Sequence, residues 1–171
     1  MKNFSNYTDY STKEDLHFES KAVHGALGTE PLTGAVSMPI FQAATFRHPE
    51  LGQTTGFAYS RLENPTRQEL ERTMAILEGG IKGFAFSSGQ AANMAVFSLL
   101  NPGDHVITSV CEHNSVLRPL YLMEQRGVKV TYLPADSKGR IAYDELENAY
   151  EPETKAVVIM HASNLTGNVT D

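Results

Sequence analysis

Short apolar runs alternate with segments of helical periodicity through the chain after residue 83. The apolar runs predict strands at 84–86, 105–108, 128–133 and 156–160. The segments between them predict helices at 90–100, 116–125 and 144–149. Strands that alternate with helices favour an α/β fold with a partial open, mostly parallel sheet and flanking helices, in which ligands bind beyond the carboxyl ends of the strands.

The first part of the chain is less regular. Residues 1–15 are polar and unpatterned, which is typical of a disordered or partner-wrapped arm. Apolar positions within 16–24 predict a short helix that Gly25 closes. Residues 33–42 are punctuated by Pro and Gly and predict an extended crossing without regular structure, of the kind that can pack on another subunit.

A strong helix start follows at Asn64-Pro65-Thr66. The Asn side chain can cap the helix, and Pro occupies the first helical position, where its missing N–H costs nothing. Leu70, Met74 and Leu77 then share one face, and Gly79-Gly80 ends the helix.

The turn Ser87-Ser88-Gly89 joins the predicted strand 84–86 to the apolar helix that begins at Gln90. Unpaired N–H groups of the first helical turn, the positive end of the helix dipole and two hydroxyls converge there. Such a corner can bind a phosphate group. The same residues also suit an ordinary serine-capped turn, and both interpretations remain open.

Composition excludes several classes of protein. The net charge is −6, from 14 basic and 20 acidic residues, and no basic stripe is present, so we expect no nucleic-acid partner. No apolar run has membrane-spanning length, so we expect no membrane partner. The single cysteine, Cys111, forms no intrachain disulfide, and the polar start lacks the apolar segment of a secretory signal. We therefore expect a cytoplasmic protein.

Other polar residues could line the same ligand site. Tyr59 and Arg61 offer a phenol and a planar fork of donors that suit a phosphate, although a surface Arg beside a core Tyr has the same pattern. His113 follows a predicted strand end and could stack on a flat cofactor, or serve only as a helix-entry residue with Asn114 or Ser115 as cap. Asn164 follows the next strand and could hold a ligand hydroxyl or carboxylate.

Competing chemistries have weaker patterns. The residues that could form a metal set have spacings that match no compact zinc site, so we expect no metal; they are His105, Cys111, His113 and His161. Cys111 could carry a persulfide, but a small buried residue near a strand end is the simpler interpretation. A nucleotide-binding module would need a Gly-x-Gly-x-x-Gly turn, which the sequence does not show.

Over about residues 18–107 the sequence resembles the transsulfuration family of pyridoxal 5'-phosphate (PLP) enzymes, which includes cystathionine gamma-synthase, methionine gamma-lyase and the O-acetylhomoserine sulfhydrylases. The motifs that carry this resemblance are Ala58–Arg61 with Asn64–Thr66, Leu77–Gly80 and Ala85–Ala92. It implies the N-terminal part of the large domain of PLP fold type I. The domains expected are an arm with a short helix at 1–45 and an incomplete PLP-binding large domain at 46–171.

From about residue 105 to 171 the sequence resembles instead the class V aminotransferases and cysteine desulfurases. The motifs are Glu112–Leu120, Leu133–Asp136 and His161–Gly167. The transsulfuration family has a Tyr-Gly-Gly-Thr segment near here, whose Tyr stacks on the cofactor, and this chain lacks it. The chain therefore reads as a mosaic of two families that share one scaffold.

These resemblances imply roles for individual residues. Ser88, Gly89 and Gln90 would give backbone amides to the cofactor phosphate. Tyr59 and Arg61 would reach the phosphate of the neighbouring subunit in a homo-oligomer, as in the transsulfuration group.

The resemblance of residues 105–171 to the desulfurases implies that His113 covers the pyridine ring and that Asn164 contacts the ring hydroxyl or the substrate carboxylate. PLP chemistry also needs a lysine that holds the cofactor covalently and a carboxylate that keeps the ring nitrogen protonated. In both families these residues come after the point that corresponds to Asp171, so no catalytic residue is assigned and we expect the chain to be inactive alone.

The resemblance thus implies a PLP-dependent lyase or transferase of sulfur amino-acid metabolism, transsulfuration type, that acts on carbon–sulfur bonds of sulfur-containing or O-acylated amino acids. One alternative is a cysteine desulfurase-like class V fragment. Another is a non-catalytic fragment that binds PLP weakly or pairs with a full-length homologue.

Overall fold

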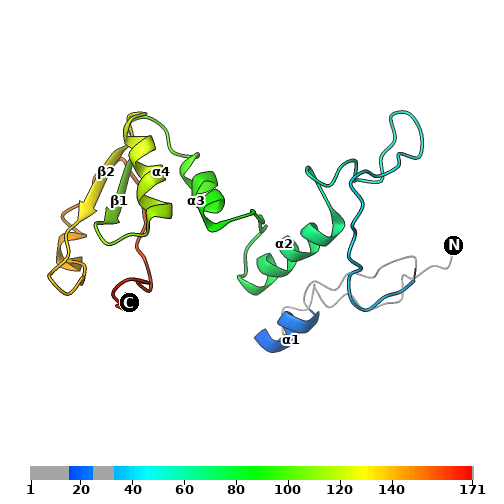
Figure 1. Ribbon diagram of the computed structural model, residues 1–171, viewed down its shortest axis with the longest axis horizontal. Helices are drawn as coiled ribbons and strands as arrows, with labels where there is room; N and C mark the ends of the chain where they lie inside the picture. The colour runs from blue at the N-terminus through cyan, green and yellow to red at the C-terminus, as the bar shows by residue number, and fades with distance from the viewer. Residues whose placement is uncertain (1–15, 25–32, 171) are drawn as a thin grey trace. The chain divides into compact units, whose positions relative to one another are not determined.

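The computed structural model describes residues 16–24 and 33–170 (Figure 1). Its contacts divide the chain into two compact units, Met1–Ala85 and Phe86–Asp171, and each is described by itself. The division expected at residue 45 concerns the domains of the family fold and stays a prediction. The polar arm predicted at 1–15 lies outside the described residues.

The first unit contains helices α1 (Phe18–His24) and α2 (Pro65–Leu77). Helix α2 begins as predicted: the Asn64 side chain accepts a hydrogen bond from the Thr66 backbone N–H at 2.9 Å, and Pro65 is buried at the first helical position. The predicted apolar face is largely uncovered within the described residues, since Leu70 is 54% and Met74 45% exposed. Ala75 is the buried apolar residue of this helix beyond its first turn.

Residues 33–43 form no helix or strand, as predicted for the extended crossing. The crossing is tied to the start of α2 by three hydrogen bonds, the longest from Thr66 Oγ1 to the Pro39 carbonyl at 3.5 Å. The Phe41 N–H donates to Thr66 Oγ1 at 2.9 Å, and Asn64 Nδ2 donates to the Phe41 carbonyl at 3.1 Å. One residue, Asn64, therefore caps the helix and fixes the crossing.

The second unit is built on a three-stranded parallel sheet in the order β2-β1-β3. The strands are β1 (His105–Ser109), β2 (Lys129–Leu133) and β3 (Thr154–Val157), and the helices are α3 (Gly89–Phe97) and α4 (Asn114–Glu124). The parallel sheet with flanking helices confirms the predicted α/β class. All five residues of β1 are buried, as expected for a central parallel strand.

Because the three strands run in parallel, their carboxyl ends lie at one edge of the sheet. The register pairs Ser109 of β1 with Leu133 of β2, and Ile107 with Val157 of β3. We call the loops that leave this edge, residues 110–113, 134–142 and 158–170, the carboxyl-edge loops.

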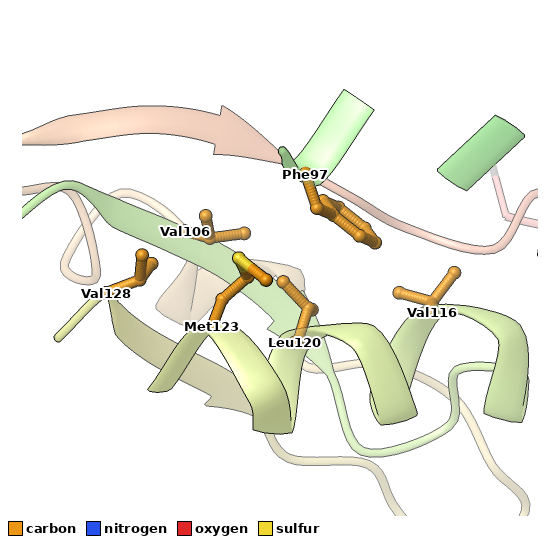
Figure 2. Packing of buried hydrophobic residues seen from close by; sticks show 6 residues of the cluster. All are labelled: Phe97, Val106, Val116, Leu120, Met123 and Val128. Carbon is orange, nitrogen blue, oxygen red and sulfur yellow. The ribbon is translucent and has the colours of Figure 1, made fainter. Parts of the chain in front are cut away.

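The hydrophobic core lies between this sheet and α4. Figure 2 shows Leu120 and Met123 of α4 pointing toward Val106 of β1 and Phe97 of α3. These four side chains are at most 3% exposed. Burying each of them contributes about 1.5–3 kcal/mol, so this contact accounts for much of the stability of the second unit.

Two predicted elements are absent. Residues 84–86 form no strand, and Phe84 and Phe86 are 68% and 48% exposed. No strand in the described part of the chain pairs with this segment, so its backbone has no ladder to join. Residues 144–149 form no α-helix beyond the 3-10 turn η2 (Tyr143–Glu145), because its start has no side-chain cap and the segment is acidic and short.

Among the residues that the structure describes, none of the helices is long and apolar enough to cross a membrane.

His105 joins all three strands at the amino end of β1. Its ring is 1% exposed, with Nδ1 hydrogen-bonded to Thr154 Oγ1 at 2.8 Å and Nε2 to Thr131 Oγ1 at 2.9 Å. We expect His105→Ala to lower the free energy of unfolding by about 2–4 kcal/mol, because it leaves a cavity and removes the ring partner of two half-buried hydroxyls, of which Thr154 Oγ1 keeps the Glu151 N–H. Urea titration followed by circular dichroism measures this. The exposed His161→Ala is the matched control, and an equal loss in both variants would contradict the role of His105.

Gly83 packs directly on the backbone of α2. A Cβ at this position would lie closer than 3.0 Å to the Glu71 carbonyl oxygen, whereas a Cβ at Gly80 would lie 3.8 Å from the nearest atom. We expect Gly83→Ala to cost about 1–3 kcal/mol of stability and Gly80→Ala to be close to neutral. Thermal unfolding of both variants compares them, and a Gly83→Ala protein as stable as Gly80→Ala would show that this packing is dispensable.

Candidate functional site

The carboxyl-edge loops contact one another. The loop after β3 reaches the loop after β2 through Asn168 Nδ2, which donates to the Lys138 carbonyl at 2.7 Å. The loop after β1 approaches the same turn, with Cys111 Sγ at 3.9 Å from the Gly139 carbonyl. Residues distant in sequence therefore meet at this edge, which is where parallel α/β sheets bind ligands.

The predicted phosphate corner lies at the start of α3. Ser88 is the N-cap, and its Oγ accepts a hydrogen bond from the Ala91 N–H at 3.1 Å. The amides of Gly89 and Gln90 have no partner within the described residues, and a Cβ at Gly89 would meet nothing within 4 Å. The serine cap and the open amides thus coexist. We call Ser87–Gln90 the phosphate corner.

His113 is the N-cap of α4. Its Nδ1 accepts a hydrogen bond from the Ser115 N–H at 3.1 Å, so in the neutral ring the proton sits on Nε2. The helix-entry interpretation is thus correct, although His113 itself is the cap rather than Asn114 or Ser115. The ring is exposed, and Nε2 has no partner within the described residues, so the cap leaves one ring nitrogen free for a ligand.

Helix α3 is fixed beside the start of α4. Asn93 Nδ2 donates to the Ser115 carbonyl at 3.2 Å and lies 3.3 Å from Ser115 Oγ. Ser115 Oγ is in turn 3.0 Å from His113 Nδ1. Asn93 lies one turn after the phosphate corner, so this chain of contacts holds the corner and His113 on adjacent helices.

Asn164 sits in a compact loop after β3. An isolated bridge between Ala162 and Val169 closes the loop, and Ser163 Oγ accepts hydrogen bonds from the Leu165 and Thr166 N–H groups at 3.3 and 3.2 Å. The Asn164 side chain is exposed and has no hydrogen-bond partner in the part of the chain that the structure describes. Its amide is therefore available to a ligand.

Sequence patterns alone did not single out Glu112 as a site residue. Its side chain is 7% exposed, and Oε1 accepts hydrogen bonds from Ser109 Oγ at 3.1 Å and from the Met160 N–H at 2.6 Å. A carboxylate after a buried strand is more often solvent-exposed than buried. The only signal was its position between a strand end and His113, and its partner Met160 is 48 residues away.

Tyr59 and Arg61 belong to the first unit. Arg61 Cζ lies 4.9 Å from the centre of the Tyr59 ring, a cation–π contact, and the main chain of Tyr59 forms a bridge with Thr45. The structure therefore brings these two residues together. Their contribution to the site of the second unit stays a prediction.

Two described groups have shifted pKa values, and neither was a predicted ligand contact. Hydrogen bonds from the Arg140 and Lys138 N–H groups lower the pKa of Asp136. Its charge therefore stabilises the turn above the usual aspartate pKa, and that contribution fades as the pH falls through the lowered value. Burial, followed by the hydrogen bond to Glu124, raises the pKa of Tyr132.

The metal alternative fails on geometry. His105 lies at the amino end of β1, whereas Cys111 and His113 lie beyond its carboxyl end, so the proposed ligands do not converge. Within the described residues, no group of three His, Cys, Asp or Glu side chains could hold a metal ion. Cys111 is half-buried, which falls short of the buried residue expected.

Comparison with known proteins assigns a family. The family described as Cys/Met metabolism PLP-dependent enzyme matches residues 19–171. A cystathionine gamma-lyase of Bacillus subtilis is 39% identical over 150 residues, which cover 87% of this chain and 38% of the relative. A cystathionine beta-lyase of Lactococcus lactis subsp. cremoris is 41% identical over 153 residues, which cover 90% of this chain and 39% of the relative.

A solved structure agrees. The cystathionine gamma-lyase from Lactobacillus plantarum, determined in complex with L-serine, superposes with a TM-score of 0.72 at 36% identity, over 91% of this chain and 39% of that one. This chain spans about two fifths of the length of these relatives.

The resemblance to class V enzymes over 105–171 finds no support in these comparisons. The family match runs unbroken through that range to residue 171, so one family accounts for both halves that the motifs had separated. The chain belongs to the Cys/Met metabolism family of PLP-dependent enzymes, the transsulfuration group.

Proposed function

We propose that this chain supplies the cofactor-binding corner of a PLP-dependent enzyme that acts on carbon–sulfur bonds in sulfur amino-acid metabolism. The observation that carries the proposal is the phosphate corner, in which the Gly89 and Gln90 amides lack partners at the start of α3. The positive end of the helix dipole and these free donors favour an anion. Two further exposed groups, His113 and Asn164, suit the remainder of the cofactor.

The residues present fit PLP by their chemistry. The backbone amides of Ser88, Gly89 and Gln90 bind the phosphate in this proposal. His113 presents an exposed ring to a planar ligand, and the Asn164 amide can donate to or accept from a hydroxyl or carboxylate. When bound, PLP supplies an electron sink for the bond-breaking step.

Tyr59 and Arg61 complete the proposed site in a homo-oligomer. The planar guanidinium of Arg61 suits bidentate contact with a phosphate, and its packing on the Tyr59 ring orients it. In this proposal the pair reaches the phosphate bound by the neighbouring subunit.

The proposed substrates are sulfur-containing or O-acylated amino acids, because the relatives named above are cystathionine lyases. We propose that the chain alone is inactive. Lys129 begins β2 and pairs with Glu151 at 3.2 Å, and Lys155 lies within β3. Lys138 is in the carboxyl-edge loop after β2 but is exposed, whereas a lysine that holds the cofactor covalently needs a buried pocket. A non-catalytic segment that binds PLP weakly, or pairs with a homologue, is the alternative of a different class.

A desulfurase-like reaction is a second candidate on the strength of one observation. His113 is exposed near the point where the transsulfuration resemblance calls for a stacking Tyr. An imidazole there can move a proton as well as stack.

Titration of the purified chain with PLP, followed by equilibrium dialysis, tests the proposal. We expect saturable binding that Arg61→Ala weakens about tenfold, because a charge-assisted phosphate contact is worth about 1.5–3 kcal/mol. Arg126→Ala is the matched control: it removes the same charge from an exposed position after the end of α4, and we expect its affinity to be unchanged.

Absence of saturable PLP binding by the wild-type chain would overturn the proposed function. Equal affinity of the wild type and Arg61→Ala would remove Arg61 alone from the site. Release of thiol from cystathionine by the chain in the presence of PLP would contradict the expected inactivity.

A further inference from the structure

We propose that Glu112 is a positioning residue. Its buried carboxylate places residues 161–170, which we call the Asn164 loop, relative to His113. It thereby sets the relative positions of Asn164 and His113 in the proposed cofactor site. This inference rests on the proposed function for its role in PLP binding. The structural part, that one carboxylate fixes two carboxyl-edge loops, stands on the contacts of Glu112 itself.

Backbone pairing between β1 and the chain after β3 ends early. The last backbone bond between them runs from the Val158 N–H to the Ile107 carbonyl at 2.9 Å, and β3 itself stops at Val157. Beyond this point, side chains of residues 108–112 form the hydrogen bonds to the chain after β3. Thr108 Oγ1 donates to the Val158 carbonyl at 2.8 Å, and Glu112 Oε1 accepts from the Met160 N–H at 2.6 Å.

The Glu112 contact is the last of this series before the Asn164 loop begins. Residues 161–170 then bond mainly among themselves: the Thr170 N–H donates to the His161 carbonyl at 2.6 Å, and the Ser163 N–H donates to the Asn168 carbonyl at 2.8 Å. A loop that is closed on itself moves as a unit. Its position is therefore set by two anchors: its base, Met160, which is held by Glu112, and Asn168, whose Nδ2 donates to the Lys138 carbonyl at 2.7 Å.

The carboxylate is itself held rigidly. Ser109 Oγ donates to Glu112 Oε1 at 3.1 Å and accepts from the Cys111 N–H at 3.2 Å, and Ser109 is fully buried. His113 follows Glu112 directly in sequence and is fixed as the cap of α4. The buried side chain of Glu112 thus connects the chain just before His113 to Met160, the base of the loop that carries Asn164. A carboxylate accepts a hydrogen bond more strongly than a neutral oxygen does, so Glu112 is well suited to hold the Met160 N–H in place.

The experiment compares Glu112→Ala, Glu112→Gln and Thr108→Val in the full 171-residue chain. Amide hydrogen exchange by NMR reports the loop, and equilibrium dialysis with PLP reports the site. We expect Glu112→Ala to speed exchange at Met160 and through 161–170 about tenfold or more, with β1 still protected, and to weaken PLP binding about tenfold.

Glu112→Gln keeps an acceptor oxygen at the same place, so we expect it to restore most of both properties. Thr108→Val removes the neighbouring clamp, but Val158 stays held by its backbone bond to Ile107. We therefore expect this control to lower stability while leaving the exchange of 161–170 and the PLP affinity unchanged. That difference separates positioning from a general loss of stability.

Unchanged exchange at Met160 in Glu112→Ala would overturn the proposal, as would unchanged PLP affinity alongside a loosened loop, or an equal loss of affinity in Thr108→Val. If the wild type does not bind PLP, the proposed function fails, and the exchange data alone decide whether Glu112 fixes the loop. If Glu112→Ala does not fold, Ser109→Ala replaces it, with a smaller change in the same direction expected and no change counting against the proposal.

Discussion

The parallel pairing of β1 with both of its neighbours is the constraint on which the second unit depends. Because β1 is central and fully buried, the chain after each strand must emerge at the same edge, and three loops from distant parts of the sequence meet there. His105 secures the amino end of this arrangement with both ring nitrogens bonded. The apolar contact of α4 with β1 and α3 holds the helices against the sheet. The strand-end residues of the candidate site are placed by this arrangement.

Ser88 and His113, two groups of the candidate site, bond to the fold through some atoms and leave others open. Ser88 uses its hydroxyl to cap α3, while the amides of the next two residues remain open. His113 uses Nδ1 to cap α4 and leaves Nε2 free. Each side chain is thereby held in one orientation before any ligand arrives, which reduces the ordering cost of binding. The two interpretations that the sequence left open for these residues, structural cap and ligand contact, are compatible in the structure.

Family membership changes how the second half of the sequence is understood. The motifs between 105 and 171 had suggested a second family, but the Cys/Met metabolism match includes them. Short motifs at strand ends reflect the residues that turns, helix caps and the carboxyl edge of a parallel sheet need. The same motifs therefore recur in different enzyme families that share a fold. A match over most of the chain carries more weight than such motifs, because it includes the packed core as well as the site.

The sequence by itself determined the features that local chemistry controls. The Asn64-Pro65 start of α2, the Ser88 cap of α3 and the strand–helix–strand order from β1 to β2, with β3 after it, follow from capping, turn residues and apolar periodicity, and these were predicted correctly in kind. Only the tertiary structure decided that 84–86 forms no strand, since a strand requires a partner, and that 144–149 fails to become a helix. It also decided that Glu112 is buried. A buried carboxylate needs hydrogen-bond donors, and one of them here is the Met160 N–H, 48 residues away. A pattern of neighbouring residues cannot predict so distant a partner.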